Sequence, residues 1–406
     1  MEKIIKKYKI KNALLVQPSF PLPVGKSRNH SKYFPIGLLK ISTYLKEKFE
    51  IKTQLVFYNE TGTEEEMIPD IIFVTSIFTY WSKYVKDTVN YFKKKYPNVP
   101  IVVGGVYASL MPEHCKKYTG CDYVIQGPIE EVDEYEADED LIDIDFQILH
   151  TSRGCPRRCK FCGVYDIEEK WKCKYSIKKE IKKKKIVFYD NNILANEYIE
   201  FILDELIELK KQKKIKYVES QSGIDGRIIK EKPFLAIKLF KAGFKNIKIA
   251  WDGPLDEYKS IERQIIILEE SGFKRNEIGI FMIYNAHLSF EEVEKKRMKC
   301  AEWGVQVVGC RYIPLNQVYD NYNPFISNQT NDDYFINEKN GWTDLKNKKF
   351  KKNIRLGNIC VRYRLDFYSK TIEKGKRKTK MTKEEAREKL NDFWDPLEFH
   401  NYDEEI

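Results

Sequence analysis

Residues 150–163 read HTSRGCPRRCKFCG and contain three cysteines, Cys155, Cys159 and Cys162, in a C-x3-C-x2-C spacing. The loop directly follows an apolar, strand-like segment, and a loop this short can turn three thiolates toward one centre. Thiolate sulfur is the soft ligand that iron–sulfur clusters and zinc prefer. A structural zinc site needs four ligands, whereas three cysteines that hold a [4Fe–4S] cluster leave one iron open for a small molecule. The loop therefore predicts a metal site, with a zinc knuckle or three unrelated thiols as alternatives.

The cysteine spacing, the aromatic Phe161 before the last cysteine and the lead-in R-G-C-P resemble the radical S-adenosylmethionine (radical SAM) superfamily. The resemblance implies that the three cysteines hold a [4Fe–4S] cluster and that SAM binds the open iron through its amino and carboxylate groups. It also implies that one electron from the cluster cleaves SAM, usually to a 5′-deoxyadenosyl radical that abstracts hydrogen from an unknown substrate. The electron would come from an external donor of the flavodoxin or ferredoxin type.

Composition indicates a globular protein rather than a disordered chain. The chain has 406 residues, of which 42% are hydrophobic and 14% aromatic, so it is long enough for two domains. Its nine cysteines are irregularly spaced and suit a reducing compartment rather than a disulfide framework. The N-terminus lacks the apolar core of a signal peptide, and no apolar run approaches the ~20 residues that cross a bilayer. We therefore expect a cytoplasmic protein with no membrane partner.

Residues 1–128 alternate strand-like and helix-like segments, which predicts a doubly wound parallel α/β sheet of Rossmann type. The expected strands are 13–16, 54–58, 71–77, 101–103 and 123–126, and the expected helices are 35–48, 81–96 and 112–118. With YFPIGLLKISTYL near its start and VVGGVYA near its end, this portion resembles the cobalamin (B12)-binding-like domain that precedes many radical SAM barrels.

One departure bears on the cofactor of this domain. The D-x-H-x-x-G motif, whose histidine ligates cobalt in many such domains, is missing after the second strand, where the chain reads FYNETG over residues 57–62. We interpret His30 and His114 as ordinary surface histidines, and Gly104-Gly105 as a tight turn at a strand end. We therefore expect a domain that keeps the fold but need not hold cobalamin.

Residues 129–145 contain ten acidic residues and no Lys or Arg. They predict a solvated linker, with docking over a basic surface of the barrel as the alternative.

A second alternation over residues 146–315 predicts six strand–helix units, the partial (β/α)6 barrel that the radical SAM resemblance implies. The expected strands are 146–152, 186–190, 217–221, 247–251, 278–284 and 305–312. The expected helices are 176–183, 196–211, 232–242, 255–270 and 290–303. Ser289 with Glu292 three residues later predicts a capping box, and Gly243, Gly272 and Gly304 follow helix ends.

Functional side chains of β/α barrels project from the carboxyl ends of strands. That rule selects ten candidate cofactor or substrate contacts: Asp190, Asn191, Asn192, Gln221, Ser222, Asp225, Arg227, Asp252, Tyr284 and Arg311. By the resemblance, the first three would contact the SAM amino group, and the four from Gln221 to Arg227 its ribose or carboxylate. Helix capping and turn formation are the alternatives for these residues. Arg153 is expected to balance the thiolates or to support a loop carbonyl.

The six other cysteines, Cys115, Cys121, Cys173, Cys300, Cys310 and Cys360, show no tight spacing and are expected to be buried structural thiols. Residues 316–406 form a basic extension, with lysines at 346–352 and 374–380 around aromatic residues. This extension predicts a cap over the barrel, with nucleic-acid binding as the alternative.

The sequence thus predicts a radical SAM enzyme, and a cobalamin-dependent methyltransferase if cobalamin binds. A second cluster of the methylthiotransferase type is disfavoured because the three additional N-terminal cysteines it needs are missing. A non-catalytic metal-containing nucleic-acid-binding module and an electron-transfer protein are the alternatives from other classes. The long strand–helix alternation after Cys162 counts against both.

Overall fold

The structure, a computed structural model, describes residues 1–21, 33–58, 66–368 and 394–397. It divides the chain into two units, the first made of residues 1–148, 153–172 and 314–321 and the second of residues 149–152, 173–313 and 322–406. Several features singled out from the sequence lie outside the described residues: His30, residues 59–62 of the missing cobalt motif, and the basic residues 374–380.

The first unit is built on five parallel strands in the order β2-β1-β3-β4-β5. They are β1 (Asn12–Gln17), β2 (Lys52–Phe57), β3 (Ile71–Ser76), β4 (Ile101–Gly105) and β5 (Tyr123–Val124). The order reverses between β1 and β3, which is the point where open parallel sheets bind ligands beyond their carboxyl ends. The predicted doubly wound sheet is therefore confirmed.

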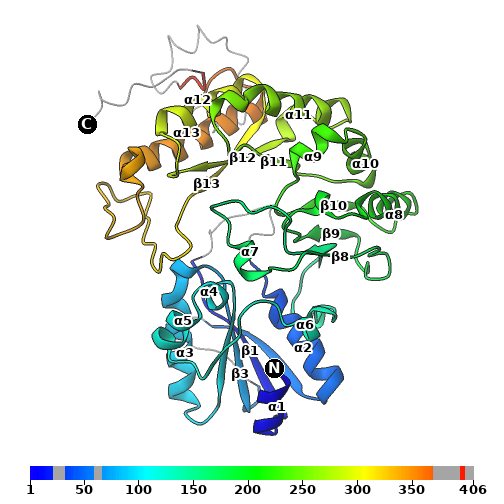
Figure 1. Cartoon of the computed structure of the whole chain (residues 1–406), viewed down its shortest axis with the longest axis vertical. Coiled ribbons are helices and arrows are strands. Elements are labelled where there is room, and N and C mark those ends of the chain that lie inside the picture. The colour runs from blue at the N-terminus through cyan, green and yellow to red at the C-terminus, as the bar shows by residue number, and fades with distance from the viewer. Residues whose placement is uncertain (22–32, 59–65, 369–393, 398–406) are drawn as a thin grey trace. The chain divides into compact units, whose positions relative to one another are not determined.

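Alternate side chains of each strand enter hydrophobic cores on opposite faces of this sheet. Leu14 and Val16 of β1 pack into one core, and Ala13 and Leu15 into the other. The first core is covered by α3 (Ser82–Lys95), α4 (Val106–Leu110) and α5 (Pro112–Thr119), and the second by α1 (Glu2–Tyr8), α2 (Ile36–Phe49) and α6 (Glu130–Asp133). Figure 1 shows α3 and α5 on one side of β1 and β3, and α2 and α6 on the other.

The second unit contains two three-stranded sheets. Strands β6 (Gln147–Leu149), β9 (Lys185–Phe188) and β10 (Tyr217–Ser220) form one, and β11 (Lys248–Ala250), β12 (Gly279–Tyr284) and β13 (Gln306–Arg311) form the other. The registers of β9 with β10 and of β11 to β13 are parallel. Between the sheets an isolated parallel bridge joins Ile224 to Ile249. The strands match the predicted ones, but a continuous partial (β/α)6 barrel is not confirmed, because the six strands do not join into one sheet.

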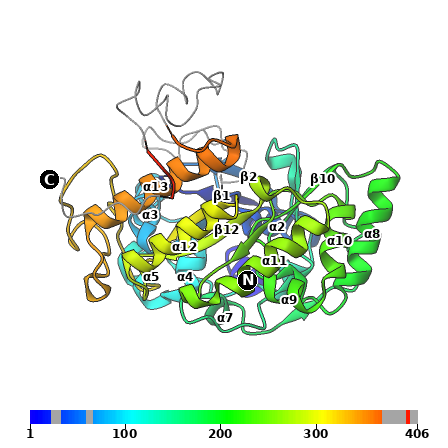
Figure 2. The ribbon, with the colours of Figure 1, turned by 90° about the horizontal axis from the view of Figure 1, so that it is seen from above.

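Helices pack on the strands of the second unit around one large core. They are α8 (Ile199–Lys211), α9 (Gly226–Glu231), α10 (Phe234–Ala242), α11 (Tyr258–Glu270), α12 (Phe290–Glu302) and α13 (Asp344–Tyr363). Figure 2 shows α8 beside α10, and a 2.8 Å hydrogen bond from Lys238 to Asp204 joins these two helices. Short 3₁₀ helices cover Thr79–Trp81, Glu139–Leu141, Ile193–Ala195, Leu255–Glu257, Arg275–Glu277 and Glu338–Asn340.

Two local predictions have different outcomes. Ser289 caps α12, since its hydroxyl accepts a 3.2 Å hydrogen bond from the amide of Glu292, but the Glu292 carboxylate accepts from Leu255 instead of closing the capping box. The predicted helix over 176–183 is wrong, because this segment forms turns. It offers only Ile177 and Ile181 as apolar positions, too few for a buried helical stripe.

Helix α13 covers β13 and contains the first half of the basic extension. The Asn358 side chain donates to the carbonyl of Val307 at 2.8 Å and accepts from the amide of Val307 at 2.8 Å, which satisfies backbone groups at the edge of β13. Within α13, Lys348 pairs with Asp344 at 2.6 Å, and Lys346 pairs with Glu291 of α12 at 3.1 Å. The described part of the extension therefore caps β13, and nucleic-acid binding stays a prediction.

Throughout the described ranges, no helix combines the length and the apolar character needed to span a bilayer.

Candidate cofactor sites in the two units

The cysteine loop lies in the first unit, between β7 (Ser152–Arg153) and α7 (Val164–Ile167). The backbone turns within it, since the amide of Cys162 donates to the carbonyl of Cys159 at 3.0 Å. Cys162 is solvent-exposed, yet surrounding protein atoms raise the pKa of its thiol, and the neighbouring Cys159 and Cys155 raise this pKa further. Among the described residues, no three His, Cys, Asp or Glu side chains converge closely enough to hold a metal ion as they stand.

Gly154 and Glu168 fix the backbone at the start of the loop. Gly154 has φ 76°, and a Cβ on it would lie 2.7 Å from the carbonyl oxygen of Lys170. Its amide donates a 2.6 Å hydrogen bond to one carboxylate oxygen of Glu168. The backbone directly before Cys155 is therefore fixed by the hydrogen bond to the Glu168 carboxylate, and no residue other than glycine fits there without strain.

Arg153 does not support the thiolates as predicted, because two carboxylates engage it. Its Nη2 lies 3.0 Å from Glu168, and its Nε lies 3.1 Å from Asp133 in an ion pair that is not aligned as a hydrogen bond.

Asp133 belongs to the acidic stretch that the sequence predicts to be a solvated linker. That stretch instead docks within the first unit: Asp133 also pairs with Lys40 at 3.1 Å, and Asp138 pairs with Lys46 of α2 at 2.7 Å.

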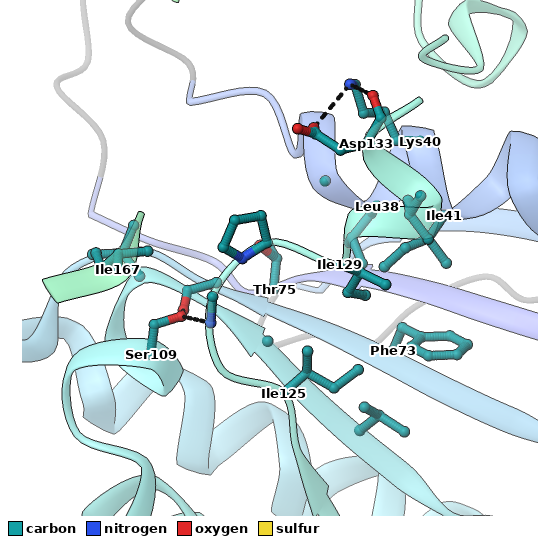
Figure 3. Close-up of a pocket in the computed structure, with 18 of the residues that line it drawn as sticks. Leu38, Lys40, Ile41, Phe73, Thr75, Ser109, Ile125, Ile129, Asp133 and Ile167 are labelled. Carbon is teal, nitrogen blue, oxygen red and sulfur yellow. Dashed lines mark hydrogen bonds and ion pairs between the residues drawn. The ribbon is translucent and has the colours of Figure 1, made fainter. Parts of the chain in front are cut away.

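A cavity of about 230 Å³ opens beyond the carboxyl ends of β3, β4 and β5, on the face of the sheet that α2 and α6 cover. Its wall is mainly aliphatic and aromatic, with Leu38 and Ile41 of α2 facing Phe73 of β3 (Figure 3). The polar groups are few. Ser109 accepts a 2.9 Å hydrogen bond from the amide of Gly127, and Lys40 pairs with Asp133 at the other end of the view (Figure 3). A concave, mostly apolar site with few polar groups is typical of organic ligands.

The paired glycines at the end of β4 have different roles. Gly105 has φ 99°, and a Cβ there would lie 2.1 Å from the carbonyl oxygen of Ser76, so Gly105 serves the tight turn that the sequence predicts. Gly104 has no such constraint, since a Cβ would meet only Ile125, at 3.9 Å. Gly37 in α2 also lines the cavity, and a Cβ there would meet nothing within 4 Å. Gly37 and Gly104 therefore leave space in the cavity that side chains would occupy.

Asp190, predicted to contact SAM, is fully buried in the second unit and engaged by the chain itself. Its carboxylate accepts from the Thr151 amide at 3.0 Å, the Thr151 hydroxyl at 2.6 Å and the Ser152 hydroxyl at 2.7 Å. Burial raises the pKa of Asp190, and these hydrogen bonds oppose that rise. Asp190 therefore fixes the segment that leads into the cysteine loop, and its contact with SAM stays a prediction.

Replacing Asp190 by alanine should lower the free energy of unfolding by about 3 kcal/mol, because it leaves buried donors unsatisfied. Urea denaturation of the purified chain measures this loss. The exposed Asp256 provides the control, and its alanine variant should stay within about 0.5 kcal/mol of wild type. Equal stabilities for both variants would contradict the role assigned to Asp190.

Three other predicted residues are brought together at the N-terminus of α9. The Asp225 carboxylate caps the helix by accepting from the amide of Arg227 at 3.1 Å, and it also accepts from Arg227 Nε at 3.0 Å and from Asn192 Nδ2 at 3.1 Å. Asn192 follows β9, and its buried Oδ1 makes no hydrogen bond within the described chain. The buried Oε1 of Gln221, after β10, is likewise without a hydrogen-bond partner there. Both oxygens therefore have unused capacity to accept a hydrogen bond.

The remaining strand-end candidates differ in accessibility. Ser222 is exposed and Asn191 half-buried. Arg311 is half-buried with its guanidinium over the rings of Tyr322 and Tyr334. Tyr284 does not fit a cofactor contact, because its ring packs in the core against Trp342 and Phe350 with centroids 5.9 and 5.1 Å away. Its side chain points from β12 toward the helices that cover the strand.

Asp252 follows β11 and is positioned by a lysine that the sequence analysis missed. Lys296 of α12 is fully buried and donates to the carbonyls of Trp251 and Gly253, at 2.9 and 2.7 Å, on either side of Asp252. Burial raises the pKa of Asp252, whereas nearby Lys296, Arg227 and His287 lower it. Asp252 is half-buried, and its carboxylate makes no hydrogen bond or ion pair in the part of the chain that the structure describes.

Burial lowers the pKa of Lys296 from 10.5 to about 8, against the attraction of Asp252. Between these two values the unfolded chain binds more protons than the folded chain, so stability rises with pH. Below about pH 8 Lys296 is charged in both the folded and the unfolded chain, so the burial of its charge lowers the stability of the fold by the full amount. We therefore expect the stability of wild type relative to Lys296→Met to increase from pH 8 to pH 10, measured by urea denaturation. The exposed Lys295→Met is the control, and the same pH dependence in both variants would contradict this assignment.

Sequence reasoning missed Glu168 and Lys40 as well as Lys296, because nothing in their spacing links them to Cys155 or Asp252.

The prediction that His114 is an ordinary surface residue and the prediction that all six other cysteines are buried both need correction. His114 is half-buried and bonded to Tyr107 at 2.8 Å, so it is no ordinary surface residue. Cys310 is exposed and Cys173 half-buried, whereas Cys115, Cys121, Cys300 and Cys360 are buried as predicted.

Comparisons with known proteins agree with this architecture. Residues 29–135 match the model of the B12 binding domain. Among solved structures, the chain is similar to a radical S-adenosylmethionine methyltransferase, TsrM, from Kitasatospora setae, with a tryptophan substrate and a SAM analogue (aza-SAM) bound. The TM-score is 0.54 at 13% sequence identity, over 76% of this chain and 75% of that chain. No curated protein sequence matches the chain.

At this identity the structural likeness shows a shared fold. The B12-binding-like domain predicted from the N-terminal sequence is confirmed, and so is the likeness in fold to a radical SAM enzyme.

Proposed function

We propose that this chain is a radical SAM enzyme that also uses cobalamin and transfers a methyl group to a substrate whose class is open. The observation that carries the proposal is the occurrence, within the first unit, of a three-cysteine loop beside a B12-binding domain fold that has an open cavity. The structural neighbour is a radical SAM methyltransferase, which supports methyl transfer over other SAM chemistry.

The donor set of the loop fits a [4Fe–4S] cluster. Cys155, Cys159 and Cys162 offer soft thiolate ligands on one short loop, and the influence of Cys159 and Cys155 on the pKa of Cys162 supports this assignment. Because the three thiols do not converge as they stand, the proposal takes the loop to rearrange when the cluster binds; Cys162 is exposed and the other two are only partly covered. Gly154 and Glu168 would hold the lead-in backbone during that movement.

The second unit offers groups that fit SAM. The acceptor oxygens of Asn192 and Gln221 suit the amino group, and the guanidinium of Arg227 suits a carboxylate. Asp225 would orient both Asn192 and Arg227 through the hydrogen bonds already described. Asp252, held by Lys296, is the strand-end carboxylate available to a substrate. Asp190 and Tyr284 take no part in this proposal.

The cavity of the first unit has room for one planar ring of a cobalamin, and the rest of the cofactor would lie outside it. Its apolar wall suits a buried ring, and Gly37 and Gly104 keep room that side chains would take. The missing D-x-H-x-x-G motif means that the proposal assigns no histidine ligand to cobalt. The sequence made cobalamin doubtful for that reason, and the match to the B12 binding domain now supports it.

When bound, the cluster would supply one electron to SAM and the cobalamin would carry a methyl group. The chain itself would orient the SAM amino group through Asn192 and Gln221 and exclude water from the cavity through Leu38, Ile41 and Phe73. An external electron donor of the flavodoxin or ferredoxin type and a cytoplasmic location stay predictions.

The test is an anaerobic incubation of the chain, reconstituted with iron, sulfide and hydroxocobalamin, with SAM and a strong reductant, followed by mass spectrometry. S-adenosylhomocysteine, the product left when SAM gives up its methyl group, should form only when hydroxocobalamin is present. 5′-Deoxyadenosine alone would support a radical SAM enzyme of another class. A metal-loaded chain that converts no SAM would contradict the proposal and favour the binding-module alternative.

A further inference from the structure

A continuous chain of ion pairs runs from α2 to the residue before Cys155. Lys40 lies 3.1 Å from one oxygen of Asp133, and Arg153 Nε lies 3.1 Å from the other. Arg153 Nη2 lies 3.0 Å from one oxygen of Glu168, and the second oxygen of Glu168 accepts the 2.6 Å hydrogen bond from Gly154. All members belong to the first unit.

The same four charged side chains form part of the cavity wall. Lys40, Asp133, Arg153 and Glu168 all line the cavity. They are only partly covered: the side chains of Arg153 and Asp133 are each 28% exposed, and that of Glu168 is 14% exposed. Water in the cavity therefore has access to ion pairs that end at the cysteine loop.

We infer that Arg153 is a positioning residue that couples the filling of the cavity to the conformation of the cysteine loop. The inference rests on the proposed function, because it takes cobalamin as the group that fills the cavity and an iron–sulfur cluster as the group that the loop holds. It concerns what Arg153 does between these two groups and assigns it no contact with substrate.

The physical basis is the local dielectric. A ligand that fills the cavity displaces water from the exposed sides of Arg153 and Asp133, and charge pairs strengthen when water is removed. A stronger Arg153–Glu168 pair holds the carboxylate that accepts the hydrogen bond from the Gly154 amide, and Gly154 itself has a left-handed backbone (φ 76°) that lies close to the Lys170 carbonyl. The direction of Cys155 is thereby restricted.

Coupling of this kind is reciprocal. If the ligand in the cavity favours one conformation of the loop, a cluster that holds the loop in that conformation raises the affinity of the cavity for its ligand by the same factor. This gives a measurable consequence that does not depend on catalytic activity: hydroxocobalamin should bind more tightly to the cluster-loaded chain than to the metal-free chain.

The chain offers a matched control in Lys46. This residue pairs with Asp138 at 2.7 Å and so also joins α2 to the acidic stretch; the Lys46 side chain is 41% exposed and that of Asp138 8%. Neither Lys46 nor Asp138 lines the cavity, and neither contacts Arg153 or Glu168. Lys46→Met therefore removes a comparable ion pair without interrupting the path to the loop.

The experiment titrates hydroxocobalamin into metal-free and cluster-loaded protein and follows its absorbance. Wild type and Lys46→Met should bind about 5-fold or more tightly when loaded, the lower end of typical coupling. Arg153→Met should bind equally in both forms, and Arg153→Lys should keep part of the difference, because an ammonium cannot span two carboxylates as a guanidinium does. Glu168→Gln, which keeps an acceptor for Gly154 but loses the charge, should behave as Arg153→Met.

The outcomes separate the inference from the proposed function. If Arg153→Met and Glu168→Gln take up iron and keep the full wild-type difference, Arg153 does not couple the two sites and the inference is wrong. If wild type binds hydroxocobalamin equally in both forms, the inference is also wrong, while the proposed function stands. If wild type takes up iron but binds no hydroxocobalamin, the proposed use of cobalamin fails and the inference fails with it.

Discussion

Replacing Cys159 by alanine should reduce the iron content of the reconstituted chain to background and abolish SAM cleavage. Cys159 is the middle of the three thiolates, and two sulfur ligands on a short loop cannot hold a cluster that needs three. Iron and sulfide assays, with absorbance near the thiolate-to-iron charge-transfer bands, measure the first effect. Mass spectrometry of the adenosyl products measures the second. Loss of the cluster should be complete rather than partial.

Cys310→Ala is the matched control, because Cys310 is an exposed thiol outside the loop. It should keep the iron content and the SAM cleavage of wild type. If Cys159→Ala retains the full iron content, the metal is held elsewhere and the cluster assignment is wrong. If Cys310→Ala loses as much iron as Cys159→Ala, adventitious binding by accessible thiols explains the result better than a built site.

Replacing Gly104 by leucine should weaken cobalamin binding by about 10- to 100-fold, since overpacking costs about 1–3 kcal/mol and each 1.4 kcal/mol is about tenfold in affinity. The substitution fills the cavity without straining the backbone, because Gly104 has no positive φ and its Cβ would meet only Ile125 at 3.9 Å. Absorbance titration with hydroxocobalamin measures the affinity. Iron uptake and the midpoint of thermal unfolding should stay near their wild-type values.

Gly104→Ala gives a graded control, because a single methyl group takes far less of the cavity and should weaken binding by much less. A variant in α2, Glu47→Leu, adds a similar apolar side chain at an exposed position outside the cavity and should bind as wild type. Unchanged binding by Gly104→Leu in a folded protein would mean that the cavity does not receive cobalamin.

The fold was predictable from the sequence to the extent that apolar segments fix the strands. The five strands of the parallel sheet in the first unit and the six strands of the two three-stranded sheets in the second lie where the apolar runs indicate, because buried parallel strands are nearly continuous in apolar residues. The two-residue strand β8 (Lys172–Cys173), which pairs with β7, has no apolar run and was not predicted. Helix prediction failed where that signal is thin. The segment 176–183 is rich in lysine, and Ser176 bonds to Glu205 of α8 at 2.7 Å in place of helical structure.

The strand-end rule located the candidate residues but could not give the direction of their side chains. Successive side chains of a strand point to opposite faces. Tyr284 therefore points into the core against Trp342, whereas Asn192 and Gln221 keep oxygens without a partner in the described chain. Asp190 has the position of a ligand contact, but Thr151 and Ser152 occupy its carboxylate. Only the folded chain brings Asp190 to Thr151 and Ser152, since 38 or more positions separate Asp190 from them in sequence.

The ion pairs of Arg153 could not be predicted for a similar reason. Asp133 lies within a run of ten acids that look alike in sequence, and Glu168 has no motif that ties it to Gly154. The paired glycines of β4 were visible as a motif, but their division of roles was not. Gly105 makes the turn and Gly104 leaves the cavity open, a difference that depends on φ and on the neighbours of each Cβ.

The proposed function requires that one chain hold both an iron–sulfur cluster in its cysteine loop and a cobalamin in the cavity of its first unit. Its most direct test is a count of both groups in one sample, after anaerobic reconstitution with iron, sulfide and hydroxocobalamin and removal of unbound material by gel filtration. We expect about four iron atoms and about one cobalamin per chain, with iron lost in Cys159→Ala and the cobalamin content lowered in Gly104→Leu. A chain that retains zinc in place of iron, or iron without cobalamin, would contradict it.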